Sequence, residues 1–152
     1  MAYSTAEARE QILEALGEAA DELALALACL GEAFEQLDET SAEGLETQLF
    51  GPVQAAYGRA MRTYSDFTAR HSLAGRAFET RSPGVQSQGA KVFIQRAIEA
   101  TGRADHAIAA LQDSMLPIEA GDAALRAGLS GVRELIDGLP MQAREVVRTL
   151  GR

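Results

Sequence analysis

The chain of 152 residues is poor in residue types on which many protein activities depend, with no tryptophan, one cysteine and two histidines. A single cysteine excludes an internal disulfide and a cysteine-based zinc site. That residue, Cys29, lies inside an apolar run, which is typical of a small buried side chain. We therefore expect Cys29 to pack rather than to react.

The two histidines also lack the spacing of a carboxylate-bridged metal site in a helical bundle, which needs two Glu-x-x-His pairs. The residues three positions before His71 and His106 are Thr68 and Arg103. The sequence has no Cys-x-x-Cys-His haem attachment site and no nucleophile elbow. These absences predict no metal and no cofactor, and they favour a protein that is not an enzyme.

Long apolar runs are missing too, since a membrane-spanning helix needs about 20 such residues. Glu7, Glu10 and Glu14 stand where a secretory signal would be apolar. Lysine occurs only at Lys91, against 13 arginines, which indicates the codon usage of a GC-rich bacterial genome. We therefore expect a bacterial, cytoplasmic protein that does not act on membranes.

Charge is distributed unevenly along the chain, whose formal net charge is −8. Residues 1–46 contain 12 acidic residues and one arginine, whereas residues 47–152 contain 10 acidic and 13 basic residues. The acidic first helix could pair with arginines of the same bundle, or its acidic face could meet a basic partner. The negative total disfavours nucleic acid as the partner.

Alanine, leucine and glutamate, which favour helices, are abundant. A capping box of Ser4 and Glu7 predicts a first helix over residues 5–37. One heptad seam runs along it: Leu13, Leu16, Ala20, Leu23, Leu27, Leu30, Phe34 and Leu37. Beside that seam, Ala19, Ala26 and Ala33 would let a neighbouring helix approach closely.

Three further helices are predicted from the same kind of spacing. The second spans residues 42–80, with a capping box of Thr40 and Glu43 and a kink or break at Gly51-Pro52. The third spans residues 83–115 and begins at Ser82-Pro83, and the fourth follows Leu116-Pro117 and is interrupted near Gly138 and Pro140.

Four helices of about 30 residues with short connections predict an all-α fold in one domain over residues 1–152. Short turns make successive helices antiparallel. The expected architecture is therefore an up-down-up-down four-helix bundle.

The eight apolar residues from Leu23 to Leu30 exceed what one buried stripe requires. We therefore predict a non-catalytic protein that acts by association, as a homo-oligomer such as a dimer or with another protein. The residues predicted to form the interface are Leu23, Leu25, Leu27, Cys29 and Leu30.

A second hypothesis rests on the rings at Phe50, Tyr57, Tyr64 and His71, which are spaced by seven on one helix. They could form an aromatic core layer, or Tyr57, Tyr64 and His71 could line a pocket for a small ligand. Nearby Arg70 and Arg76 would favour an anion.

A third hypothesis rests on the segment from His71 to Ala77. His71, Leu73, Gly75 and Ala77 match the pattern His-x-Leu-Lys-Gly-x-Ala, and the segment resembles the phosphoacceptor motif of histidine phosphotransfer domains. Those domains are four-helix bundles, and the resemblance implies that His71 would carry a phosphoryl group. The family's lysine is replaced by Ala74, which removes the cation beside the phosphate.

Overall fold

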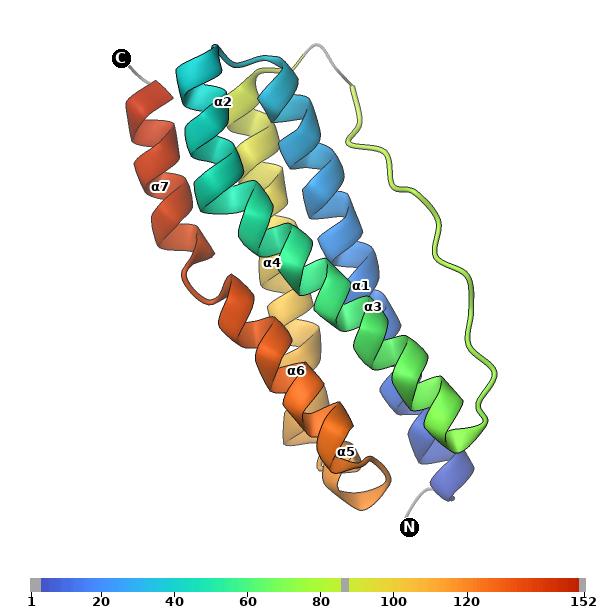
Figure 1. Cartoon of the computed structure of the whole chain (residues 1–152). Helices are drawn as coiled ribbons and strands as arrows, with labels where there is room; N and C mark the ends of the chain where they lie inside the picture. The colour runs from blue at the N-terminus through green and yellow to red at the C-terminus, as the bar shows by residue number, and fades with distance from the viewer. Residues whose placement is uncertain (1–3, 86–87, 151–152) are drawn as a thin grey trace.

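The computed structural model describes residues 4–85 and 88–150, which are helical apart from their connections, with no strand in that part of the chain (Figure 1). Its elements are α1 (Thr5–Glu35), α2 (Glu39–Leu45), the π-helical turn η1 (Glu46–Phe50), α3 (Gly51–His71), α4 (Ala90–Asp113), α5 (Leu116–Glu119), α6 (Ala123–Ile136) and α7 (Leu139–Leu150).

The long helices form a bundle of four columns, but their directions differ from the predicted order. The column of α2, η1 and α3 runs antiparallel to α1. An extended segment then runs back to the end of the bundle at which that column begins (Figure 1). As a result α4 runs parallel to α3, and α6 and α7 run back beside them. The order is up-down-down-up, and the up-down-up-down prediction is wrong because the second connection is long.

Two predicted helix boundaries around that connection are also wrong. α3 ends at His71 rather than at residue 80, and Ser72 takes a left-handed conformation with φ 53° and ψ 47°. α4 begins at Ala90, after Gly89, rather than at Ser82-Pro83. The segment between the helices contains Gly75 and Gly84, which weaken helix formation.

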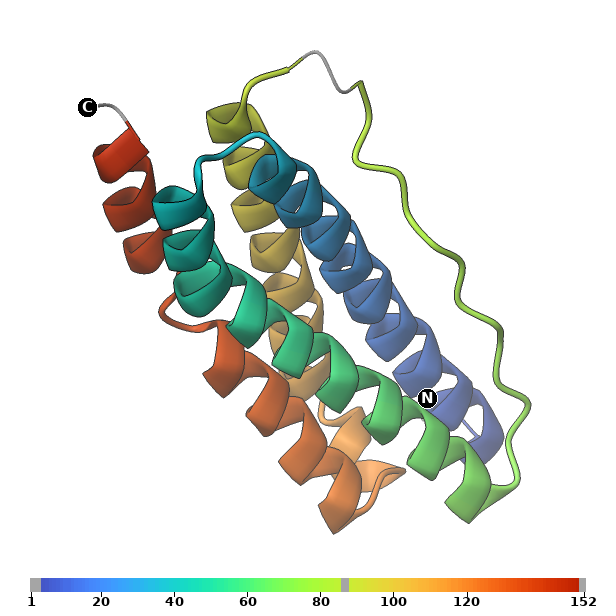
Figure 2. The ribbon, with the colours of Figure 1, turned by 45° about the horizontal axis from the view of Figure 1, so that its top comes forward.

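We call residues 73–85 the strap, because they run in extended form along α1 (Figures 1 and 2). The side chains of Leu73 and Phe78 pack against the core from this segment. Near its far end, the carbonyl oxygen of Pro83 accepts a hydrogen bond from Arg96 of α4, at 3.4 Å. The strap therefore crosses α1 from the α3 side to the α4 side.

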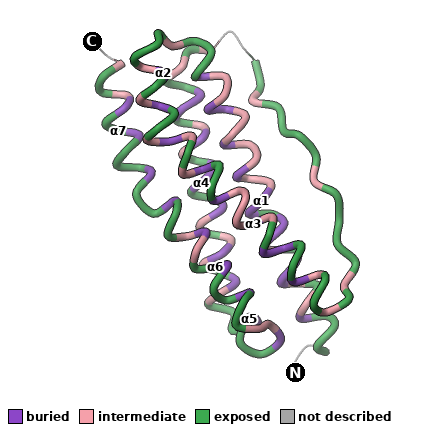
Figure 3. The backbone as a smooth tube through the Cα atoms, in the orientation of Figure 1, coloured by how far each residue is buried: buried purple, intermediate pink, exposed green. Residues whose placement is uncertain are grey.

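α1 has neighbours on several sides. It packs between α3 and α4, and the strap lies along a further side (Figure 2). The small residues Ala19, Ala26 and Ala33 are all fully buried. The buried residues follow the inward faces of the helices (Figure 3).

The caps and breaks of the remaining helices agree with the sequence in part. Ser4 accepts a hydrogen bond from the Glu7 backbone nitrogen at 3.1 Å, which confirms the first cap. The second cap is Asp38, not Thr40, because the Asp38 carboxylate reaches the Ser41 nitrogen at 2.8 Å. The hydrogen bond from the Ser41 backbone nitrogen lowers the pKa of Asp38.

Of the kink or break predicted at Gly51-Pro52, the break is wrong, because the chain stays helical there and its irregularity is the π-helical turn η1. The Gly51 nitrogen donates to the Glu46 carbonyl, five residues back, so the preceding turn is π-helical. This wider turn accommodates a proline that would clash with an α-helical carbonyl. The predicted interruption near Gly138 is confirmed, since α6 ends at Ile136 and α7 begins at Leu139.

Among the described residues, no helix is both long and apolar enough to cross a membrane.

Candidate functional site

The predicted aromatic line does not form one pocket. Tyr64 is buried toward the strap, Tyr57 is half-buried, and His71 sits at the last position of α3. None of the five principal grooves in the described part of the chain is lined by any of these three residues. The structure therefore does not bring them together around a ligand-sized space.

Tyr64 instead receives the strap. Its hydroxyl oxygen accepts a hydrogen bond from the Arg76 backbone nitrogen at 3.2 Å. Its ring meets that of Phe78 edge-to-face, with centroids 5.0 Å apart. The Arg76 guanidinium lies over the ring of Phe78, 4.2 Å from the ring centroid. This cluster attaches the strap to α3.

The same arginine ties the strap to α1. Arg76 and Arg81 both pair with Asp21 of α1, at 2.7 Å and 3.0 Å. On another side of α1, Glu22 pairs with Arg103 of α4 at 2.7 Å. Part of the acidic first helix is thus matched by arginines within the bundle, and Arg76 is already occupied by a carboxylate.

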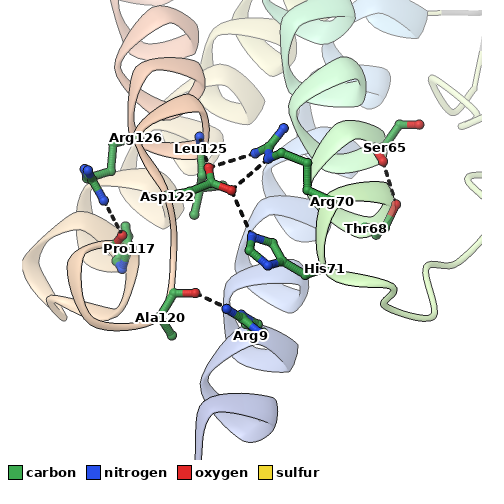
Figure 4. A network of polar contacts seen from close by, with 10 residues as sticks. All are labelled: Arg9, Ser65, Thr68, Arg70, His71, Pro117, Ala120, Asp122, Leu125 and Arg126. Atoms are coloured by element: carbon green, nitrogen blue, oxygen red, sulfur yellow. Dashed lines mark hydrogen bonds and ion pairs between the residues drawn. The ribbon is translucent and has the colours of Figure 1, made fainter.

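A second polar cluster joins the start of α6 to the end of α3 (Figure 4). The Asp122 carboxylate accepts from Arg70 at 2.7 Å and 2.8 Å. It also accepts from the Leu125 backbone nitrogen at 2.8 Å, as the N-cap of α6. The Nε2 atom of His71 lies 2.8 Å from the same carboxylate. Beside it, Arg9 of α1 donates to the Ala120 carbonyl at 3.0 Å (Figure 4).

The Asp122 carboxylate is held in its charged form. The hydrogen bonds from Arg70, with those from Leu125 and His71, bring the pKa of Asp122 far below its ordinary value, against the opposing effect of burial. With Arg70 and His71 directed at it, this carboxylate joins the end of α3 to the start of α6. The cluster is best explained as a tertiary anchor.

The phosphotransfer resemblance gains no support from this geometry. A phosphoryl group on Nε2 of His71 would meet the Asp122 carboxylate, which is of like charge. Leu73, Gly75 and Ala77 belong to the strap, so they do not share a helix with His71. A side chain at Gly75 would approach the Tyr64 ring to 3.2 Å, which gives this glycine a packing role.

The predicted interface residues divide between the core and the surface. Leu23, Cys29 and Leu30 are at most 1% exposed, so they are covered within one chain. Burial raises the pKa of the Cys29 thiol. Leu25 and Leu27 are half-buried and pack against the core. Only these two could reach a second chain without a rearrangement of the bundle.

The most suggestive surface lies between α4 and α7, where the sequence marked no site. This groove, the α4/α7 groove, has a volume of about 690 Å³. Ile94, Ile98, Ala143 and Val147 form its apolar floor. Its rim carries Lys91, Arg144 and Arg148, with Glu99 as the acidic residue in the lining.

The cations of this rim are largely free of internal partners. Lys91 and Arg144 are exposed and form no ion pair with any described residue. Arg148 pairs with Glu145 on its own helix. A sequence signal existed, because Arg144 and Arg148 are one turn apart and Val147 lies between them. Their position beside Lys91, however, depends on how α7 packs on α4.

A hollow of the opposite charge lies between the end of α1 and α2. This Phe34 hollow has a volume of about 540 Å³. Its lining consists of Phe34, Glu35, Leu37, Glu39, Ala42, Glu43 and Glu46. Phe34 is 40% exposed, an unusual position for a large aromatic ring on a predicted helix seam.

A third groove, of about 840 Å³, separates α1 from α4 in the other half of the bundle. Its walls mix Glu18, Glu22 and Glu99 with Arg103 and His106. Within the described ranges, no three His, Cys, Asp or Glu residues are placed to share a metal ion. The mixed charges give this groove no clear ligand preference.

The described residues therefore form two polar clusters that hold helices and strap together, and one apolar groove whose basic rim has no such role.

Comparison with protein families, with curated proteins and with solved structures finds no match to this chain.

Proposed function

We propose that this protein acts by association, and that the α4/α7 groove binds the apolar face of an acidic helical segment. The observation that carries the proposal is a basic rim around an apolar floor, on a chain whose net charge is −8. Two of the three rim cations, Lys91 and Arg144, form no ion pair within the described chain, so they are available to the carboxylates of a partner.

The groove has the chemistry of a helix-binding site. Amphipathic helices bind grooves through apolar residues spaced three and four apart, with polar residues at the edges. Ile98 and Val147 are half-buried in the groove, so a partner would remove their remaining apolar surface from water. That burial contributes roughly 25 cal/mol per Å² before the costs of association.

Charge would select the partner and its orientation. Lys91 stands near the first turn of α4, and Arg144 and Arg148 face it from α7. Acidic residues along the edges of a bound helix would meet these three cations. Such rim charges chiefly raise the association rate and exclude basic partners, and their effect falls as salt rises.

Catalysis and small-ligand binding have less support. The tyrosine, histidine and arginine side chains predicted for those roles are engaged in the strap contacts and the Asp122 anchor. Tyr57 is the exception, but it lines none of the five principal grooves of the described chain.

The proposal can be tested with two labelled helical peptides that share an apolar face and carry either glutamate or lysine along both edges. Fluorescence anisotropy of dilute protein should show binding of the glutamate peptide, weakening with salt, and little binding of the lysine peptide. Arg144→Glu should weaken the glutamate peptide about tenfold or more, because it replaces attraction with repulsion.

Arg62→Glu is the matched control, since Arg62 is an exposed helical arginine without an ion-pair partner among the described residues. It changes the net charge equally but lies outside the groove. Equal binding of both peptides, or equal effects of the two substitutions, would contradict the proposal. Circular dichroism should show both variants folded.

A further inference from the structure

The Phe34 hollow and the α4/α7 groove are complementary in chemistry. The hollow presents an exposed aromatic ring beside four glutamates and no lysine or arginine. The groove presents an apolar floor with three cations and one glutamate. The two surfaces are opposite in charge and both expose apolar side chains, so each has the chemistry that a partner of the other would need.

The glutamates of the hollow are not neutralised by ion pairs within the described chain. Asp21 and Glu22, further back on α1, are paired with arginines of the strap and of α4. The carboxylates of Glu35, Glu39, Glu43 and Glu46 form no ion pair with any described residue. The internal pairing that accounts for one part of the acidic segment therefore stops before the hollow.

The two surfaces lie on opposite edges of the bundle. At this end the columns contact one another in the ring order α1, α4, α7 and the column of α2 and η1. The groove opens along the α4–α7 edge and the hollow along the α1–α2 edge. One copy therefore cannot bring its own hollow into its own groove, and two copies cannot make both contacts at once around a two-fold axis.

We propose that the occupant of the α4/α7 groove is the acidic segment that lines the Phe34 hollow of a second copy of this chain, with the exposed ring of Phe34 at its centre. The inference rests on the proposed function and names its partner. Phe34 of one copy packs on Ile98 and Val147 of the next, and its glutamates face Lys91 and Arg144. Because the contact joins different surfaces, it is head-to-tail and leads to an open series or a ring.

Sedimentation velocity over a range of concentrations tests the inference. The wild-type chain should exceed the mass of one copy as concentration rises, and should return toward one copy in high salt. Phe34→Glu, in the hollow, and Arg144→Glu, in the groove, should each shift association by about tenfold or more in concentration.

Both variants have matched controls. Leu135→Glu changes a residue that is 38% exposed, against 40% for Phe34, and lies outside both surfaces. Arg62→Glu again controls for Arg144→Glu. Association that responds equally to the variants and their controls would place the contact elsewhere and overturn the inference.

A mixture of the two variants gives the sharpest result. Phe34→Glu keeps an intact groove, and Arg144→Glu keeps an intact hollow. Together they should form a pair and nothing larger, because the remaining groove has lost its net positive charge and the remaining hollow has lost its aromatic ring. A mixture that stays at the mass of one copy would overturn head-to-tail contact.

The peptide experiment separates this inference from the proposed function. If the wild-type chain stays at the mass of one copy but binds the glutamate peptide, the groove binds a different protein and self-association is wrong. If neither occurs, both proposals fail.

Discussion

Two outer faces of the bundle differ in what covers them. The face between α1 and α3 is covered by the strap, which is held by Arg76, Tyr64 and Phe78. The face between α4 and α7 has an apolar floor but no covering segment in the described chain. The acidic residues near its cations are Glu99, Glu145 and, at the Lys91 end, Asp38, and the one ion pair among them joins Arg148 to Glu145.

The difference shows two outcomes for apolar surface that the helical columns do not bury against one another. On the first face the chain supplies its own cover and neutralises Asp21 with two arginines. On the second face the described chain leaves both charge and apolar surface uncovered, and we propose that a partner covers them. In the run from Leu23 to Leu30, for which we predicted a second chain as cover, the half-buried residues are Ala24, Leu25, Leu27 and Ala28, and the others are buried within the chain.

The largest effect should come from releasing the strap. Phe78→Ala removes the ring that contacts both Tyr64 and Arg76, and should lower the free energy of unfolding by about 2 kcal/mol. Chemical denaturation would measure it. Val85→Ala is the control, because Val85 is 65% exposed on the same strap. Binding at the α4/α7 groove should not change, and a loss of binding would show that the two faces are coupled.

The next effect concerns the anchor beside which the strap begins. Asp122→Ala should cost about 1–2 kcal/mol, through loss of the α6 cap and of the contacts with Arg70 and His71. Asp122→Asn should cost less, because asparagine also caps helices. Glu134→Gln, on the exposed side of α6, should have no effect. Equal losses for the two Asp122 variants would assign the effect to charge alone.

The same anchor predicts a dependence on pH. The pKa of Asp122 is lower in the folded chain than in the unfolded chain, so its stabilising contribution is fully present above the ordinary carboxyl pKa of about 4. That contribution is lost as pH falls below this value toward the folded pKa. Denaturation at several pH values should therefore show a smaller acid loss in Asp122→Asn than in the wild-type chain.

The smallest effect separates the two tyrosines of α3. Tyr64→Phe removes the acceptor of the Arg76 backbone nitrogen and should cost about 1 kcal/mol. Tyr57→Phe should cost almost nothing, because the Tyr57 hydroxyl has no hydrogen-bond partner among the described residues. Calorimetric melting of both variants would show whether the strap distinguishes them. A matching loss in Tyr57→Phe would contradict the assignment.

The helices themselves were largely predictable because their signals are local. The Ser4 cap, the alanine line on α1 and the interruption near Gly138 depend on residues within a few turns. The end of α3 was not predictable in this way. Phe78 continues the apolar spacing of α3, but it reaches the core from an extended chain by packing on Tyr64.

The candidate site was hidden for a related reason. Lys91 is about fifty residues from Arg144 and Arg148 in sequence. It becomes their neighbour only where α7 packs on α4. Conversely, the arginines that the sequence favoured for an anion, Arg70 and Arg76, are occupied by Asp122 and Asp21. A sequence lists charges but not which of them are already paired.

The sequence by itself determined that the chain is helical, where α1 begins, and that its apolar residues exceed one buried stripe, because propensity, capping and spacing act within a single helix. Only the tertiary structure decided the direction of the columns and what covers α1. Those outcomes depend on the path of the strap, residues 73–85, and that path is set by contacts with residues far away in the chain, such as Asp21 and Tyr64.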